Sequence, residues 1–146
     1  MKDDKGTLKL ENQLCFRLYS ASKEIVRRYK PFLDPLGLTY TQYIVMMVLW
    51  SQESVSVKEL GSRLRLESST LTPLLKKLEA AGYVTRERSR EDERVLVVSL
   101  TDEGRDLHDR AMDVPLCMVD ALGIDPQLGA DLAHLLDEFL AEIDAR

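Results

Sequence analysis

The chain carries two cysteines, Cys15 and Cys117, and a thiol is the most reactive side chain that its sequence offers. As a thiolate, cysteine attacks the O–O bond of a peroxide, and its first oxidation products are reversible. Two cysteines are too few for a disulfide framework, so a disulfide here would be regulatory. No histidine adjoins either cysteine in sequence, and His108 and His134 complete no metal-binding spacing with Cys117. We therefore expect no enzyme active site, metal or cofactor.

A second set of residues has the properties of a DNA-reading surface. In the segment 68–81, four leucines at helical spacing share one side, and Gly82 stands where a left-handed cap would end the helix. The opposite side is small and basic, and the residues expected to contact DNA there are Ser68, Ser69, Thr70, Thr72, Pro73, Lys76 and Lys77. Short or flexible side chains let a helix enter the major groove, although the same hydroxyls could simply cap a core helix.

Two runs of alternating, β-branched residues follow at 83–88 and 94–100, and a charged stretch separates them. This pattern predicts a β-hairpin, or wing, over 83–99 that reaches an adjacent groove of the DNA. The arginines expected to contact DNA are Arg86, Arg88 and Arg94. Because acidic residues surround them, Arg94 would insert into a narrow minor groove while Asp92 holds it in position. A solvated, salt-bridged turn is the alternative.

Helices must position both sets of residues. Apolar residues at helical spacing predict a long first helix over 8–32, which Pro31, Pro35 and Gly37 then break. Capping and breaking residues predict, in order, a second helix from Thr39 through Trp50, a third from Ser56 to Leu64, a long one from Thr101 to about Asp120 that Pro115 kinks, and a last one from Pro126 to Ile143.

This order of elements predicts a winged helix-turn-helix, so the fold class is mainly α with a small β wing. At 146 residues the chain has room for one domain, 1–146, with a DNA-binding lobe at 39–100. The composition, 45% hydrophobic and 31% charged, is that of a globular protein, and no apolar run approaches the roughly 20 residues that span a bilayer. Residues 1–6 lack a secretory signal, so we expect a cytoplasmic protein without a membrane partner.

The formal net charge of -5, taken alone, argues against binding to nucleic acid. The charge is unevenly distributed, however. Residues 1–57 carry eight Lys or Arg against six Asp or Glu, residues 58–100 nine against seven, and residues 101–146 three against twelve. The acidic last third would repel phosphate and leaves the middle of the chain as the face for double-stranded DNA.

Several short motifs carry a family resemblance. The wing contains Asp92-Glu93-Arg94 and is followed by Leu100-Thr101-Asp102-Glu103-Gly104. The chain also contains Leu10-Glu11-Asn12-Gln13-Leu14-Cys15-Phe16, Tyr29-Lys30-Pro31, Thr39-Tyr40-Thr41-Gln42-Tyr43 and Ser69-Thr70-Leu71-Thr72-Pro73-Leu74-Leu75-Lys76. Together they resemble the MarR family, and within it the organic hydroperoxide resistance regulators, over essentially the whole chain. The resemblance implies a repressor that binds a pseudopalindromic operator as a homodimer, formed by the helices at 8–32 and 101–146.

The resemblance also assigns roles to the thiols. Cys15 matches the family's sensing cysteine, and Tyr29 and Tyr40 match tyrosines that hydrogen-bond to it from the other subunit. Tyr19, one helical turn beyond Cys15, is placed to contribute. Periodicity alone would instead make Cys15 a buried core residue. Oxidation by an organic hydroperoxide gives a sulfenic acid, which Cys117 would resolve as in one branch of the family, unless Cys117 is inert and a low-molecular-weight thiol caps Cys15.

Two other functions remain open at this stage. A regulator of the same fold could be released from DNA by a reversibly bound small aromatic ligand, and Cys15→Ser would then leave the response intact. A thiol peroxidase would instead consume hydroperoxide catalytically with a reductant. The motifs favour hydroperoxide sensing, in which the oxidised dimer prefers a different spacing or angle of its recognition helices.

Overall fold

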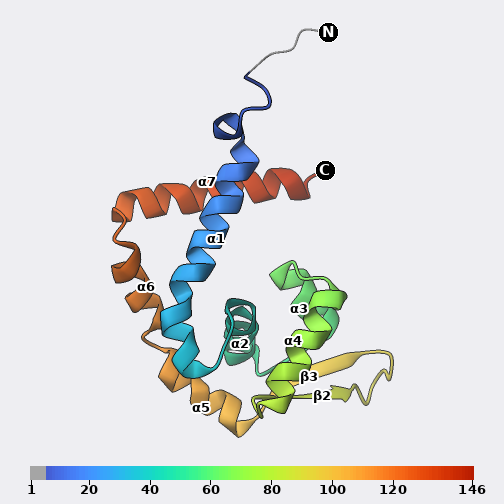
Figure 1. The fold of residues 1–146 in the computed structure, drawn as a ribbon. Coiled ribbons are helices and arrows are strands. Elements are labelled where there is room, and N and C mark those ends of the chain that lie inside the picture. The colour runs from blue at the N-terminus through green and yellow to red at the C-terminus, as the bar shows by residue number, and fades with distance from the viewer. Residues whose placement is uncertain (1–5) are drawn as a thin grey trace. The chain divides into compact units, whose positions relative to one another are not determined.

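The structure is a computed structural model that describes residues 6–146, so residues 1–5 of the polar start lie outside the described residues. The prediction of a mainly α fold with a small β wing is confirmed (Figure 1). The elements are, in order, η1 (Leu10–Asn12), α1 (Leu14–Leu33), η2 (Asp34–Leu36), α2 (Tyr40–Gln52), β1 (Ser54–Ser56), α3 (Val57–Leu64), α4 (Ser68–Ala80), β2 (Val84–Arg88), β3 (Leu96–Leu100), α5 (Asp102–Ala111), α6 (Val114–Leu122) and α7 (Pro126–Asp144).

The chain divides into two compact units, Met1–Val114 and Pro115–Arg146. The first unit contains α1 to α5 and the whole sheet, and the second contains α7 and nearly all of α6. The helix-turn-helix and the wing therefore lie in one unit. That unit also includes α5.

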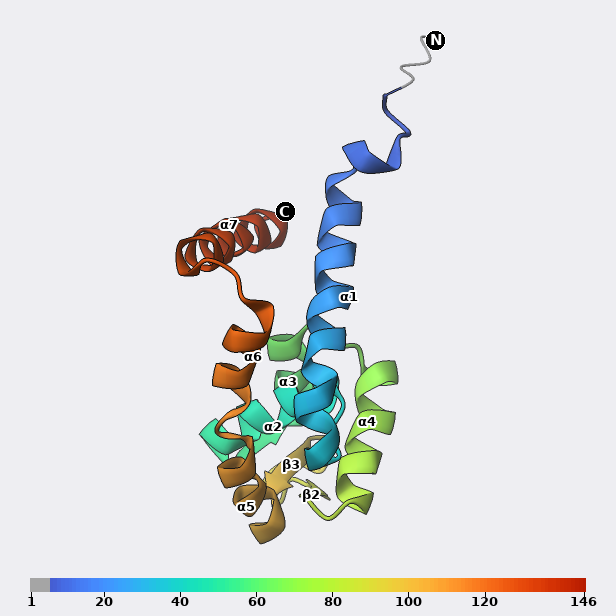
Figure 2. The ribbon, with the colours of Figure 1, turned by 60° about the vertical axis from the view of Figure 1, so that its left-hand side comes forward.

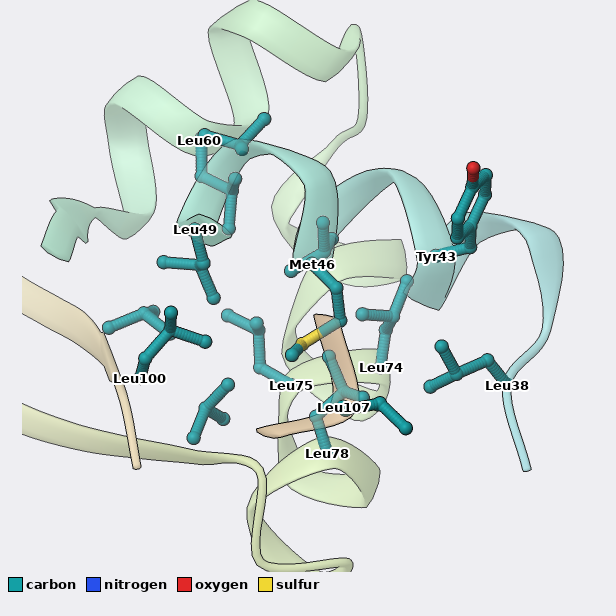
Figure 3. Close-up of a cluster of buried hydrophobic side chains, with 14 of the residues drawn as sticks. Leu38, Tyr43, Met46, Leu49, Leu60, Leu74, Leu75, Leu78, Leu100 and Leu107 are labelled. Atoms are coloured by element: carbon teal, nitrogen blue, oxygen red, sulfur yellow. The ribbon is translucent and has the colours of Figure 1, made fainter. Parts of the chain in front are cut away.

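The core of the first unit lies between α2, α3, α4 and the sheet. Figure 3 shows side chains from these elements in mutual contact around Met46, which is fully buried. The largest fully buried side chains of the core are Leu33, Met46, Leu49, Leu60, Leu71, Leu75 and Leu78. Burying one such side chain stabilises the fold by about 1.5–3 kcal/mol. This core fixes the orientation of α4 relative to the wing.

The sheet has the strand order β1-β3-β2, and both pairs are antiparallel. The wing hairpin pairs Val84 with Leu100 and Arg88 with Leu96, close to the predicted boundaries. Strand β1 was not predicted, because three residues are too few to show a strand period. It places Val55 opposite Val98 and so attaches the end of α2 to the wing.

Local capping groups explain where the helices begin. The predicted capping box opens α2: the Gln42 N–H donates to Thr39 Oγ1 at 3.3 Å, and the Thr39 N–H donates to Gln42 Oε1 at 2.9 Å. Ser56 caps α3, because its Oγ accepts a hydrogen bond from the Glu59 N–H. Thr101 Oγ1 accepts the Gly104 N–H at 3.0 Å and donates to the carbonyl of Gly82 at 2.6 Å. Thr101 thus caps α5 and attaches it to the turn after α4.

Two predictions about prolines were wrong. Pro31 does not break the first helix, since α1 continues to Leu33 with Pro31 inside its last turn. Pro115 does not kink a helix running from Thr101 to Asp120. Instead α5 ends at Ala111 and a new helix, α6, begins at Val114, so that Pro115 stands in the first turn. A first turn tolerates proline because its N–H groups lack intrahelical acceptors.

Helix α1 begins at Leu14 rather than at residue 8, and Leu33 is its one buried residue. Its N-terminal half extends away from α2, α3 and α4 in Figures 1 and 2. Within residues 6–146, no single helix is long and apolar enough to cross a membrane. The bent pair Leu14–Leu36 and Tyr40–Gln52 passes that test by length and composition only, and six residues of α2 are buried.

The junction of α2 with α5 is fixed by the single tryptophan of the chain. Trp50 Nε1 donates to the carbonyl of Gly104 at 2.8 Å, and the indole meets the ring of His108 edge-on at 5.5 Å. A Cβ atom on Gly104 would stand 2.2 Å from the carbonyl oxygen of Tyr83. Only glycine therefore allows α5 to approach the lobe this closely.

Candidate functional site

Helix α4 separates an apolar face from a polar one, as the leucine spacing predicted. Leu71, Leu74, Leu75 and Leu78 are buried. The residues expected to contact DNA, namely Ser68, Ser69, Thr70, Thr72, Pro73, Lys76 and Lys77, are all exposed. Four leucines thus hold the helix from one side while small and basic side chains remain accessible on the other.

At the tip of the wing, the side chain of Arg94 forms an ion pair with Asp92, and the backbone N–H of Arg94 donates a further hydrogen bond to the same carboxylate. Arg94 Nε donates to Asp92 Oδ1 at 3.0 Å, Arg94 Nη2 donates to Asp92 Oδ2 at 3.1 Å, and the Arg94 N–H also donates to Oδ1. The side-chain hydrogen bond from Arg94 lowers the pKa of Asp92 below its ordinary value. Because the Arg94 side chain is 90% exposed, Asp92 orients a guanidinium that remains accessible to solvent. The expectation that Asp92 holds Arg94 agrees with this geometry.

The other two arginines of the wing differ from each other. Arg86 Nη2 donates to Glu79 Oε1 at 3.1 Å, and this side-chain hydrogen bond lowers the pKa of Glu79. With 18% of its side chain exposed, Arg86 joins β2 to the end of α4 and is less available to phosphate than Arg88, which is exposed. Arg86 is therefore placed to orient the wing against the recognition helix.

Cys15 is exposed in the first turn of α1, so within one chain it is not the core residue that its periodicity suggested. Tyr19, one turn further along, is exposed as well, and the Lys23 ammonium stands 5.2 Å from the centre of its ring. Cys117, on α6 in the second unit, is half-buried. Both cysteines are free thiols.

Tyr29 and Tyr40 meet at a ring distance of 4.9 Å, and Tyr43 joins them at 5.7 Å from Tyr29. Burial raises the pKa of Tyr29 and of Tyr43, and the neighbouring tyrosines raise it further. These two hydroxyls therefore stay protonated and able to donate hydrogen bonds at neutral pH. Tyr43 was missed as a site residue because an aromatic ring at helical spacing also fits the core.

Cys15 does not contact this tyrosine cluster in its own chain. Fourteen residues of one α-helix separate Cys15 from Tyr29, which corresponds to about 21 Å at 1.5 Å per residue. A Tyr side chain cannot reach across that length. The structure thus brings together Tyr29 and Tyr40, and it leaves Cys15 and Tyr19 apart from them.

A cavity of about 220 Å³ adjoins the cluster between the C-terminal half of α1 and the start of α2. Leu33 and Leu38 form buried parts of its wall, Tyr40 contributes its ring, and Lys30 lies at the rim in an ion pair with Asp34 at 3.1 Å. The cavity is apolar inside and charged at its edge.

The family is decided by a match over most of the first unit. The pattern that defines the family described as Transcriptional regulator SarA/Rot matches residues 27–111. This chain belongs to the SarA/Rot-type, MarR-like family of transcriptional regulators. The match spans Tyr29, Tyr40, the helix-turn-helix and the wing of this SarA/Rot-type regulator, while Cys15 and Cys117 lie outside the matched residues. The resemblance inferred from the sequence motifs is confirmed, and the family comprises regulators rather than enzymes.

One curated relative and two solved structures extend the comparison of this SarA/Rot-type regulator beyond the family match. The organic hydroperoxide resistance transcriptional regulator of Bacillus subtilis (strain 168) is 48% identical over 128 residues, which cover 88% of this chain and 85% of the relative. Reduced AbfR of Staphylococcus epidermidis bound to DNA is 32% identical, with a TM-score of 0.77 over 95% of this chain and 97% of AbfR. A disulfide-formed AbfR is 33% identical, with a TM-score of 0.61 over 97% of this chain and 94% of AbfR.

Proposed function

We propose that this regulator is a homodimeric repressor that releases its operator when an organic hydroperoxide oxidises Cys15. The observation that carries the proposal is the separation of Cys15 from the tyrosine cluster along one rigid helix, about 21 Å. A thiol site that includes both can form only between two chains. The sensor would then be part of the dimer interface, where a covalent change alters the relation between two DNA-binding lobes. The repressor would act in the cytoplasm, where its operator is.

The DNA-binding part of the proposal comprises residues 39–100. Helix α4 would enter the major groove with its exposed face, which carries Thr72 and Lys76, and the wing would reach the adjacent minor groove with Arg94. Exposed apolar residues on α1 and α7 would form the dimer interface and set the spacing of the two recognition helices. Half-sites one helical turn apart, about 34 Å, suit this twofold arrangement.

The chemistry at Cys15 balances with one equivalent of oxidant. The thiolate attacks the terminal oxygen of the hydroperoxide, the O–O bond breaks, and the organic alkoxide leaves and takes up a proton. The sulfur takes up that oxygen and is oxidised to a sulfenic acid, while the hydroperoxide is reduced to the alcohol. The partner's tyrosine hydroxyls would donate hydrogen bonds to the Cys15 sulfur.

Cys117 is proposed as the resolving thiol. Its sulfur would attack the sulfenic acid of the partner's Cys15, so that an S–S bond forms and water leaves. The half-buried position on α6 and the disulfide state of AbfR support this role. On a non-reducing gel, peroxide should then produce a covalent dimer that Cys117→Ser abolishes. A band that persists in that variant would assign resolution to another thiol.

The function is tested by fluorescence anisotropy on the upstream DNA. We expect the reduced protein to bind, to dissociate after one equivalent of cumene hydroperoxide, and to bind again after dithiothreitol. Cys15→Ser should bind and remain bound through the whole cycle. Tyr40→Phe should slow release, whereas Tyr83→Phe, outside the cluster, should not. Release of the Cys15→Ser variant by peroxide would refute the proposal.

A second candidate function rests on the cavity beside Tyr40. At about 220 Å³ it would hold a small aromatic ligand, although it is smaller than the ordinary range of about 300–1,000 Å³. Such a ligand would release Cys15→Ser and the native protein equally. A screen of small aromatic acids against both proteins on the same DNA separates the two functions.

A further inference from the structure

The cavity of about 220 Å³ beside the tyrosine cluster combines an apolar interior with positive charge at its opening. Its lining includes apolar and aromatic side chains and two cations, namely Val26, Leu33, Leu38, Tyr40, Arg27 and Lys30. Leu33 and Leu38 are buried, whereas both cations are exposed to solvent. Such a cavity suits a molecule with an apolar body and an anionic end.

Local contacts hold the walls of the cavity in place. The Leu38 N–H donates to the carbonyl of Leu33 at 3.2 Å. Between α1 and α2 the chain reverses at Gly37, whose φ of 69° is the left-handed conformation that glycine adopts readily. The ring of Tyr40 packs against Tyr29 at 4.9 Å. Because the walls are already ordered, a ligand would bind with little entropic cost for the protein.

The volume of the cavity suits one aromatic ring with a short branched substituent. An apolar cavity of about 150 Å³ holds benzene, and this one is larger at about 220 Å³. Val26 is the lining residue through which the volume can be changed most safely. Its side chain is 43% exposed, so a substitution there leaves the buried core intact.

The opening of the cavity lies in a positively charged part of α1. Residues 23–34 contain four Lys or Arg against two Asp or Glu, so their net charge is +2. Arg27 pairs with Glu24, and Lys30 pairs with Asp34 at 3.1 Å. More than half of each of these side chains is exposed, and exposed ion pairs are weak. A carboxylate on a bound molecule can therefore compete for either cation.

We propose that this cavity binds the organic group of the oxidant, and that the preferred oxidant is an aromatic hydroperoxide that carries a carboxylate. The inference rests on the proposed function, in which the partner's Cys15 lies at the tyrosine cluster. The ring occupies the interior, the carboxylate faces Lys30 and Arg27, and the peroxide points toward Tyr40 and the thiol. Binding of this non-reacting part raises the second-order rate constant of oxidation. Val26 and Lys30 are then specificity-determining residues.

The test compares a matched pair of oxidants on the full-length reduced protein. One is the derivative of cumene hydroperoxide with a carboxylate para to the peroxide-bearing carbon, and the other is the methyl ester of that acid. Alkylation and mass spectrometry measure the loss of the reduced Cys15 thiol, and each rate is normalised to that of free cysteine. We expect the acid to react roughly 2- to 5-fold faster than the ester. Equal normalised rates would overturn the carboxylate preference.

A substitution at the opening locates this preference. Lys30→Gln should bring the ratio of the acid and ester rates toward 1 and leave the rate with cumene hydroperoxide unchanged. Arg28→Gln is the matched control, because it removes a cation of α1 that is outside the cavity lining. If both variants lower the ratio equally, the preference comes from the net charge of α1 and the assignment to the cavity is wrong.

A substitution inside the cavity tests the place of the ring. Val26→Phe narrows the cavity and should slow oxidation by cumene hydroperoxide roughly 10-fold. Hydrogen peroxide has no organic group, so its rate should stay the same. The reduced variant should keep the native Tm and the native affinity for DNA. An equal loss of rate with both peroxides would indicate a damaged thiol site and would contradict the proposal.

A molecule without the peroxide separates this role from that of a reversible effector. 4-Isopropylbenzoate should slow oxidation of Cys15 by competition and leave the reduced protein on its DNA. Release of the Cys15→Ser variant by this acid would make the cavity an effector site and overturn the proposal. If no hydroperoxide oxidises Cys15, the proposed function itself fails. If oxidation proceeds at rates that depend on neither Val26 nor Lys30, only the present inference fails.

Discussion

Helices α4 and α7 have similar amphipathic patterns, but the apolar face is buried in α4 and exposed in α7. Four leucines of α4 are buried against its own unit, whereas α7 has no buried residue. The large apolar side chains exposed on α7 are Leu128, Leu132, Leu135, Phe139, Leu140 and Ile143. The DNA-reading lobe is therefore completed by its own core, whereas the apolar side chains of α7 are left exposed, and under the proposed function they would pack against a second chain. Under that proposal, the switch would move intact lobes by changing the interface alone.

The largest expected effect is in the core of the lobe. Leu75→Ala removes a side chain that is 1% exposed, and the resulting cavity should lower the free energy of unfolding by about 2–5 kcal/mol. Urea denaturation followed by circular dichroism measures this. A loss below about 1 kcal/mol would show that the lobe collapses around the gap, and the contrast with α7 would be weaker than proposed.

The matched substitution on α7 should act on assembly instead. Leu132→Ala removes the same atoms from a side chain that is 47% exposed in one chain, so the lobe should keep its unfolding free energy within about 0.5 kcal/mol. The proposed twofold interface would lose two copies of the contact, and its dissociation constant should rise by roughly 10- to 100-fold. Sedimentation equilibrium checks the latter. Unchanged assembly would remove α7 from the interface.

Substitutions at two glycines test whether α5 packs into the lobe, as α4 does, or is largely exposed, as α7 is. Gly104→Ala should cost about 1–3 kcal/mol, because the new Cβ would stand 2.2 Å from the Tyr83 carbonyl oxygen. Gly129→Ala on α7 is the control, since its Cβ would meet only the Ile124 side chain at 3.6 Å. That change should be neutral or stabilising by about 0.5–1 kcal/mol. Thermal unfolding of both variants decides whether α5 belongs with the self-sufficient lobe.

The smallest effect concerns the wing tip. Arg94 lowers the pKa of Asp92 in the folded protein. The ion pair therefore stabilises the folded wing at pH values above the ordinary aspartate pKa, and this contribution is lost as the pH falls through the lowered pKa of Asp92. At neutral pH the pair is fully present. An NMR titration of the Asp92 carboxyl carbon should show the lowered midpoint, and Arg94→Gln should return it to the ordinary range. An unshifted midpoint in the native protein would mean that the pair does not persist in solution.

Local signals in the sequence predicted the fold well. The Thr39 and Thr101 caps depend on groups within three residues, and the leucine spacing of α4 depends on one helix. The behaviour of Pro31 and Pro115 was mispredicted because a proline's effect depends on where the first and last turns fall.

The candidate site was harder to predict from the sequence than the fold was. The ion pair of Arg86 with Glu79 and the contact of Tyr43 with Tyr29 join residues that no periodicity relates. Motif resemblance supplied Cys15 and its tyrosines, which spacing alone would have assigned to a core.

The hydrogen bond from Trp50 to Gly104 gives this regulator a built-in optical probe. With one tryptophan in the chain, every indole photon originates at the junction of α2 with α5, beside the His108 ring. Any displacement of α5 against the lobe would alter the hydrogen bonding and quenching of that indole. The emission spectrum therefore reports on the geometry of the junction of α2 with α5, without a dye and without DNA present.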